Sequence, residues 1–317
     1  MIIRSEAIGL VWLRGVRRDT LPGVATDVFI DPARGRIRWN RGDPNIGGPM
    51  RTIAFLNLKG GVGKTSSVHH LSGTLAASGR RVLLVDNDPQ ASLTQGFFGP
   101  DATESLDLSR TVHAIYTGDP MPSQVVVSTT FDRIDLVPGS YAVSSINNGD
   151  PHLAPWEIRM AMARFLGETE GYDLCLIDCP PNLALCSWAA LAASGSVVVP
   201  LQPEDYGSQG IRRIHELLGA VRASDNPHAD LIGYLITRAN LRKAIHKAYA
   251  EAMRTLYGDL VFTVEVPDSV DILEATSARK PVCKHKPRGA AAKAIQAVAD
   301  ELLARLDGLA TQEGRAA

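Results

Sequence analysis

A glycine-rich loop with two lysines constrains the fold of this chain more than any other feature. The loop reads KGGVGKTS at residues 59–66, after an apolar run and before a stretch with helical periodicity. Its glycines let the backbone curl so that successive N–H groups point at one anion, and the N-terminus of the following helix adds a positive end. A flexible turn is the alternative interpretation, but the strand before and the helix after favour a phosphate-binding loop.

The two lysines of this loop are unusual because the chain otherwise carries its positive charge on arginine. The 317 residues include 25 Arg and 8 Lys, and the first 242 positions contain no lysine besides Lys59 and Lys64. Lys64 stands where a phosphate-loop lysine reaches the β- and γ-phosphates, and the Thr65 hydroxyl stands where it holds Mg²⁺. The general pattern has glycine five positions before Gly63, and this chain departs from it there with Leu58.

Short apolar runs alternate with helical patterns from Met50 onward. We predict strands at residues 52–57, 81–86, 132–137, 172–177, 196–201, 231–237 and 261–266. We predict helices at residues 65–78, 155–168, 183–193, 208–222, 241–256 and 289–307. Apolar strands joined by helices predict an α/β fold, a mostly parallel sheet with helices on both faces. Ligands of such folds bind beyond the carboxyl ends of the strands.

Acidic side chains follow two of the predicted strands. Asp86 and Asp88 come after the second strand, and Asp178 closes the run at 172–177. Carboxylates beside bound phosphates repel them unless a metal ion or water mediates, so these positions indicate Mg²⁺ organisation and placement of an attacking water. A surface turn is the alternative interpretation of the first two.

Composition excludes several classes of protein. A hydrophobic fraction of 45% supports a real core, which excludes a wholly disordered, collagenous or coiled-coil chain. Four cysteines are too few for a disulfide scaffold, and without a Cys-x-x-Cys pair the three between Cys175 and Cys186 indicate buried thiols rather than metal ligands. There is no apolar signal core and no membrane-spanning run, so we expect a cytoplasmic protein.

Residues 1–49 differ from the rest of the chain. Two β-rich runs around a turn at residues 31–35 predict a hairpin, and the Gly/Pro-rich stretch at 42–49 predicts a linker. The segment is either an N-terminal extension or the product of an upstream start, with Met50 as the working initiator. We therefore expect an extension at 1–49, an ATPase domain at 50–310 and a flexible tail at 311–317.

These segments together resemble the ParA/MinD family of ATPases with a deviant phosphate loop. The resemblance is carried by KGGVGKTS, VDNDPQAS and LIDCPP, in the family's order and spacing, followed by VPLQPEDYGSQGIRRI and VPDSVDILEATSARKPV. It covers about residues 50–307 and implies a P-loop NTPase fold, ATP and Mg²⁺ as cofactors, and an ATP-dependent homodimer. Departures at Leu58, Asn87 and Cys179 remove no charged group from the implied mechanism.

The resemblance also implies a role for individual residues. Lys64 is the implied phosphate lysine, and Lys59 the signature lysine that reaches across the dimer to the partner's nucleotide, where a cation stabilises charge on the γ-phosphoryl group. Asp88 is the third implied catalytic residue and positions the attacking water. The implied Mg²⁺ set is Thr65, Asp88 and, through water, Asp178. The other implied nucleotide-binding positions are Gly60, Gly61, Val62, Gly63, Ser66 and Pro267.

The net charge of −1 conceals an uneven distribution. Residues 238–293 carry eleven basic and six acidic side chains, whereas residues 101–178 carry four basic and twelve acidic ones. Within the basic part, residues 279–288 hold five positive charges and no acid. Such a patch suits sequence-independent attachment to a phosphate backbone, and a solvated face is the alternative. Together with the resemblance to ParA proteins, it predicts DNA binding by Arg242, Lys243, Lys247, Lys280, Lys284 and Lys286.

We therefore predict a nucleoid-associated partition ATPase whose ATP-bound dimer binds DNA non-specifically and is stimulated by a ParB-like partner. A MinD-like membrane protein would end in a basic amphipathic helix, whereas the last predicted helix carries acids and is expected to pack on its own domain. An iron–sulfur carrier would need paired cysteines, and a sequence-specific regulator would need a helix-turn-helix pattern in residues 1–49. A small-molecule kinase or synthetase on the same loop stays open.

Overall fold

The computed structural model describes residues 50–203, 208–240 and 242–316, together with four short strands before residue 50. The chain divides into two compact units, residues 1–49 and residues 50–317. In the first unit, β1 (Ile3–Arg4) pairs antiparallel with β2 (Val11–Trp12), and β3 (Phe29–Asp31) pairs antiparallel with β4 (Arg36–Arg38). The last pair confirms the strands of the predicted hairpin, and the predicted linker at 42–49 lies outside the described residues.

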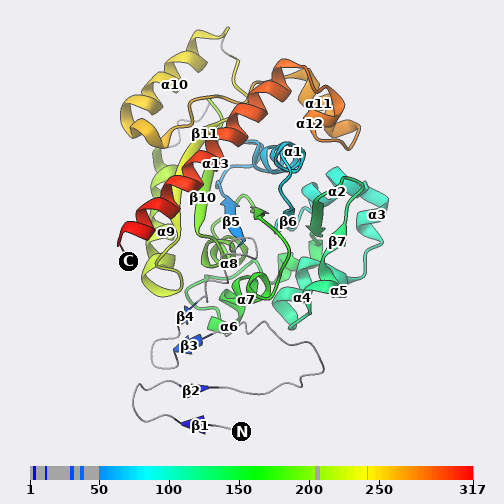
Figure 1. Cartoon of the computed structure of the whole chain (residues 1–317), viewed down its shortest axis with the longest axis vertical. Helices are drawn as coiled ribbons and strands as arrows, with labels where there is room; N and C mark the ends of the chain where they lie inside the picture. The colour runs from blue at the N-terminus through cyan, green and yellow to red at the C-terminus, as the bar shows by residue number, and fades with distance from the viewer. Residues whose placement is uncertain are drawn as a thin grey trace. The chain divides into compact units, whose positions relative to one another are not determined.

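The second unit is built on a seven-stranded sheet in the order β11-β10-β5-β9-β6-β8-β7 (Figure 1). All neighbouring strands run parallel except the short β7, which pairs antiparallel with β8 at one edge. The strands are β5 (Arg51–Phe55), β6 (Val82–Asp86), β7 (Val127–Ser128), β8 (Ile134–Val137), β9 (Leu174–Asp178), β10 (Ser196–Leu201) and β11 (Asp230–Ile236). The predicted α/β fold is confirmed.

Helices connect these strands and cover the sheet. They are α1 (Lys64–Ala77), α2 (Ser92–Phe98), α3 (Pro100–Glu104), α4 (Val112–Thr117), α5 (Pro122–Val125), α6 (Trp156–Arg159), α7 (Ala161–Gly167), α8 (Leu185–Ala193), α9 (Ser208–Ser224), α10 (Ala244–Tyr257), α11 (Val270–Ser277), α12 (Val282–His285) and α13 (Ala290–Ala316). The predicted helix at 155–168 is divided at Met160, and α13 continues through residues 311–316, where the sequence predicts a tail.

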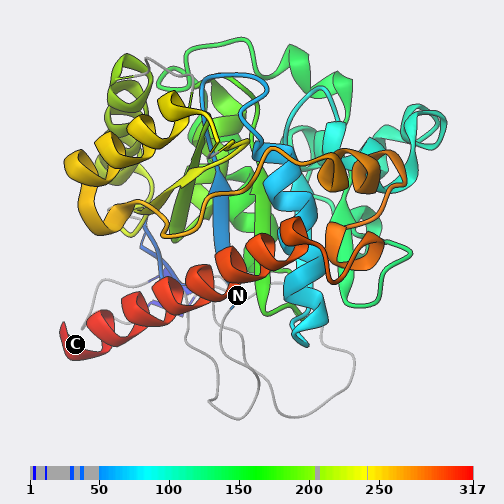
Figure 2. The same cartoon turned by 90° about the horizontal axis from the view of Figure 1, so that it is seen from above.

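The core shows why these runs form strands buried on both faces. Alternate residues of three adjacent strands, such as Ile53, Leu84 and Leu176, pack in one cluster with apolar residues of α1 and α13. Figure 2 shows these two helices on the same face of the sheet. The intervening residues, such as Leu83 and Ile177, are also fully buried, as expected for parallel strands covered by helices on both sides.

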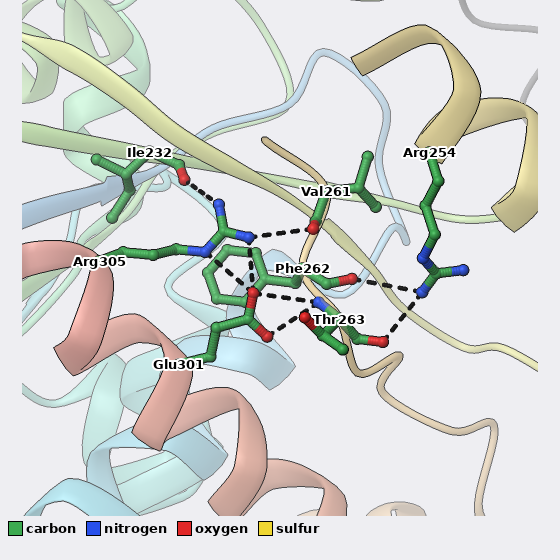
Figure 3. Close-up of polar contacts among 7 residues, drawn as sticks. All are labelled: Ile232, Arg254, Val261, Phe262, Thr263, Glu301 and Arg305. Atoms are coloured by element: carbon green, nitrogen blue, oxygen red, sulfur yellow. Dashed lines mark hydrogen bonds and ion pairs between the residues drawn. The ribbon is translucent and has the colours of Figure 1, made fainter. Parts of the chain in front are cut away.

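The predicted strand at 261–266 is wrong, because this segment makes only isolated bridges, Tyr234 with Val261 and Ala239 with Pro267. Part of its backbone still pairs with β11, because the N–H groups of Phe262 and Val266 donate to the carbonyls of Tyr234 and Ile236 at 2.9 and 2.8 Å. Side chains bind other backbone groups of the segment (Figure 3). Arg305 donates to the Val261 carbonyl at 3.0 Å, and Glu301 accepts from the Thr263 N–H at 2.9 Å. Segment 261–266 therefore closes the sheet edge without becoming part of it.

Candidate active site

Three loops meet at the carboxyl edge of the sheet because their strands are neighbours. Strand β9 lies between β5 and β6, and Asp178 is in register with both Phe55 and Asp86. The glycine-rich loop that follows β5 is thereby placed beside the acidic ends of β6 and β9. The structure brings together the residues that the sequence predicts to share one site.

The glycine-rich loop has the backbone of an anion cradle. Gly61 and Gly63 have φ of 77° and 83°, a left-handed conformation that favours glycine, and Gly63 is the N-cap of α1. At Gly60 an added Cβ would meet no protein atom within 4 Å, so packing within the described chain does not require glycine there. A glycine at this position would let a bound group come close to the loop backbone.

The Lys64 side chain is turned back into this loop. Its ammonium donates to the carbonyls of Asn57 and Lys59, each at 3.0 Å, and only 6% of the residue is exposed. Burial lowers the pKa of Lys64, and the Asp178 carboxylate opposes that shift. A buried cation held by neutral carbonyls is positioned to exchange them for phosphate oxygens.

Asp178 fits a magnesium-associated role. The residue is fully buried, and neither of its carboxylate oxygens has a hydrogen-bond partner within the described chain. Burial, and next the charge of Asp86, raise the pKa of Asp178 well above its usual range. An orphaned buried carboxylate beside the Thr65 hydroxyl suits a hard cation that also takes phosphate and water oxygens. No group of three His, Cys, Asp or Glu side chains able to hold a metal exists among the described residues.

Asp86 and Asp88 differ in what they contact. Asp86 is fully buried, and its Oδ2 accepts from the Thr94 N–H at 2.8 Å and the Thr94 hydroxyl at 2.6 Å. Burial raises the pKa of Asp86 to about 7, although the Thr94 hydrogen bonds oppose the shift. Asp86 therefore holds the start of α2, whereas Asp88 is half-buried and its carboxylate accepts from the Gln90 N–H at 3.0 Å. The partial exposure of Asp88 leaves it accessible to a water molecule.

Two further predicted residues lie at the same edge. Lys59 is exposed at the start of the loop, and its N–H donates to Asn57 Oδ1 at 3.0 Å. Pro267 pairs with Ala239, just beyond the end of β11. Whether Lys59 acts on a partner's nucleotide and Pro267 on the same chain's nucleotide stays a prediction.

Sequence reasoning missed the residues that hold the loops in place. Thr237 donates to the Val62 carbonyl at 2.6 Å and touches Gly63, and Arg238 donates to the Gly61 carbonyl at 3.3 Å. Gly139 is required because a Cβ there would lie 2.7 Å from Asp86 Cγ. Thr237 and Arg238 directly follow β11, so the rule that searches strand ends would have found them.

The cysteines behave as the sequence predicts. Cys175, Cys179 and Cys186 are fully buried and free, and burial raises the pKa of each thiol. They are part of the buried core.

The predicted DNA-binding residues lie on two separate elements. Arg242 precedes α10, Lys243 is its N-cap, and Lys247 lies in its first turn. Residues 280–286 surround α12, and the two elements lie apart in both views (Figures 1 and 2). Lys280 and Lys284 are exposed, whereas the ammonium of Lys286 is 2.7 Å from the Asp271 carboxylate. That ion pair reduces the charge Lys286 offers to an outside partner.

The last helix packs on its own domain, as predicted. Ile295, Val298, Leu302 and Leu306 are at most 4% exposed. Arg305 ties the helix to β11 through the Ile232 carbonyl at 2.7 Å and lies over the Phe262 ring (Figure 3). Among the described helices, none combines the length and apolar character needed to cross a bilayer.

Comparisons with known proteins identify the family of this chain. Residues 50–231 match the family model described as an AAA domain. The chromosome-partitioning ATPase Soj of Thermus thermophilus is 35% identical over 257 residues, which cover 81% of this chain and 97% of that protein. The chromosome partitioning protein ParA of Caulobacter vibrioides is 31% identical over 259 residues, covering 81% and 95%.

A solved structure with similar architecture is that of cobyrinic acid a,c-diamide synthase from Mycobacterium smegmatis with bound ADP and magnesium. It matches with a TM-score of 0.68 and 28% identity, covering 81% of this chain and 96% of that one. The fold, the phosphate loop and the near full-length similarity to Soj and ParA agree, and the chain belongs to the ParA/MinD family of P-loop partition ATPases.

Proposed function

We propose that this protein is a DNA partition ATPase in which ATP and Mg²⁺ close a homodimer that binds DNA non-specifically at the nucleoid. The observation that carries the proposal is the pairing of a two-lysine phosphate loop with the buried, unpartnered Asp178 carboxylate at the next strand end. A ParB-like partner would stimulate hydrolysis and release the dimer from DNA.

Each site residue has a chemical task in this proposal. Bound Mg²⁺ would neutralise phosphate charge and would be held by Thr65, Asp88 and, through water, Asp178. Lys64 would meet the β- and γ-phosphates, and Asp88 would orient the attacking water. Lys59, exposed at the mouth of the loop, would add its charge to the partner's γ-phosphoryl group only when two subunits close.

DNA attachment would use the exposed basic side chains near the C-terminus. Lys280 and Lys284 are the strongest candidates because they are exposed within a segment, 279–288, that contains no acid. Contacts to a phosphate backbone release counterions, so binding of this kind falls steeply as salt rises.

The test is retention of non-specific duplex DNA with ATP, with ADP and without nucleotide, across a salt series. We expect retention that requires ATP and declines linearly on a log–log plot against salt. A Lys280→Ala, Lys284→Ala double variant should weaken binding and reduce the salt slope by about 2, because each phosphate contact contributes about one unit. DNA binding that is absent in ATP, or insensitive to salt, would contradict the proposal.

A small-molecule synthetase is the second candidate, because a solved neighbour carries a synthase name. A small hollow lies beside Lys59. This space, lined by Leu58, Leu201 and Ile211 among others, measures about 160 Å³. Ligand pockets usually measure roughly 300–1,000 Å³, so the hollow is small for a second organic substrate.

A further inference from the structure

The basic segment, residues 279–288, packs against α1 and α2, the two helices that follow the loops of the candidate nucleotide site. Helix α1 begins at Lys64, and α2 begins at Ser92, just after the Asp88 loop. If the segment grips DNA, as proposed above, its supports are the elements that a bound nucleotide would touch first. The inference below rests on that proposed function and concerns its regulation.

His70 of α1 makes one hydrogen bond to the segment and a second to α11, the helix just before it. Its Nδ1 accepts from the Val282 N–H at 3.1 Å, and its Nε2 faces the Thr276 hydroxyl at 3.3 Å. Because Nδ1 is an acceptor, the ring proton lies on Nε2. His70 is fully buried, and burial lowers its pKa to about 4, so the ring stays neutral near pH 7 and both bonds persist.

Gly73, one helical turn further along α1, lets the segment come closer than any side chain would permit. A Cβ at position 73 would lie 2.2 Å from Pro281 Cβ and 3.1 Å from Cys283 Sγ. Pro281 and Val282 are buried against α1 while Lys280 and Lys284 on either side are exposed. The two lysines are thus the exposed neighbours of a rigidly packed contact.

The other end of the segment rests on α2. The Arg279 guanidinium covers Gly99, where a Cβ would lie 2.6 Å from Arg279 Cζ. Arg279 itself has φ of 55°, a left-handed conformation that is uncommon for a non-glycine residue. Helices α1 and α2 also touch each other, since the His69 and Phe97 rings meet edge to face at 4.6 Å. The basic segment, α1 and α2 therefore pack against one another.

We propose that these anchor contacts, made by His70, Gly73 and Gly99, couple the nucleotide site to the DNA-binding lysines. A close-packed interface transmits a shift of α1 or α2 instead of absorbing it, so a change at either loop repositions Lys280 and Lys284. The coupling is reciprocal by linkage: DNA must raise the affinity for ATP by the factor by which ATP raises the affinity for DNA.

The experiment measures the ratio of DNA dissociation constants without nucleotide and with ATP in full-length variants. His70→Ala removes both hydrogen bonds, and Gly73→Ala pushes the segment off α1. His70→Asn keeps an acceptor near the Nδ1 position and serves as the rescue. Gly219→Ala in α9 is the matched control, because a Cβ there would meet no atom within 4 Å.

We expect His70→Ala and Gly73→Ala to reduce the wild-type ratio at least tenfold, while the ATP affinity measured without DNA stays within about twofold. His70→Asn should recover most of the ratio, and Gly219→Ala should match the wild type. If Gly73→Ala fails to fold, the comparison of His70→Ala with His70→Asn still tests the inference.

Two results would overturn the inference. One is a wild-type ratio retained in His70→Ala; the other is an equal loss of DNA affinity with and without ATP, which would show a purely structural role. Failure of the proposed function is visible separately, because the wild-type chain itself would then show no ATP-dependent DNA binding.

Discussion

At the scale of single residues, Asp86 and Asp88 differ in their contacts: the first holds neighbouring structure, and the second is proposed to act in the reaction. One oxygen of Asp86 accepts two hydrogen bonds from Thr94, while Asp88 is half-buried and accepts from the Gln90 N–H. Two carboxylates two positions apart therefore perform different tasks, which the spacing alone does not reveal.

Asp88→Ala should stop turnover without loss of ATP or DNA binding. The change removes the group proposed to orient water, a contribution on the order of 100-fold or more in rate. Phosphate release under saturating ATP measures the turnover, and a fluorescent ATP analogue measures affinity. Asp119→Ala, an exposed acid elsewhere, is the control, and hydrolysis at the wild-type rate in Asp88→Ala would remove the proposed role.

Lys59→Ala should separate ATP binding from dimer closure. Because Lys64 stays in place, the ATP affinity of the monomer should change by less than about threefold, whereas hydrolysis should fall by on the order of 100-fold or more if the lysine acts in trans. Sedimentation with ATP should show the variant as a monomer at concentrations where the wild type dimerises. Full dimerisation of the variant would contradict action across the interface.

At the scale of elements, the sequence predicts the parts of the fold that leave a local pattern, such as an apolar run or a phosphate-binding glycine spacing. The five longest strands and the loop between β5 and α1 follow from apolar runs and glycine spacing, since strand burial and anion binding each leave a local pattern. Helices α2 to α5 and α11 to α12 are short, and their positions depend on contacts such as Thr94 with Asp86 that no local pattern encodes. The segment at 261–266 has a strand-like pattern, but only some of its backbone groups bond to β11, and Arg305 and Glu301 bind others.

Gly139→Ala tests one such contact. The added methyl group would lie 2.7 Å from Asp86 Cγ and 3.1 Å from the Ala91 Cα, so Asp86 or α2 must move. We expect a loss of about 1–3 kcal/mol in the free energy of unfolding, typical of overpacking. Urea unfolding measures it, with Gly149→Ala as control because a Cβ at that position meets nothing within 4 Å. Equal stability of the two variants would show that the site relaxes freely.

At the scale of the whole molecule, two buried histidines link stability to pH. Burial lowers the pKa of His69 to about 3 and that of His70 to about 4. Between pH 6.5 and pH 4 the unfolded chain therefore binds more protons at these rings than the folded chain, and their contribution to stability is lost as pH falls. The pKa of Asp86 is raised to about 7, so its contribution to stability grows as pH falls, opposite to that of the histidines. The histidine contribution is therefore measured as the difference between two variants that both contain Asp86.

His70→Asn should reduce this acid sensitivity. One proton fewer is taken up on unfolding, so the loss of stability between pH 7 and pH 5 should be smaller than in the wild type by about 2 kcal/mol. Thermal or urea unfolding at both pH values gives the comparison, in which the contributions of the carboxyl groups cancel. Parallel pH profiles for the two proteins would show that His70 titrates normally.

The tie between α13 and the sheet also has a mechanical consequence. Arg305 joins the final helix to the Ile232 carbonyl on β11, the strand at one margin of the sheet, and to the Val261 carbonyl beside it. A load applied beyond the helix would be carried first by this guanidinium and only then by the sheet. In a single-molecule stretching experiment, Arg305→Ala should let the helix peel away at lower force, before the nucleotide site is disturbed.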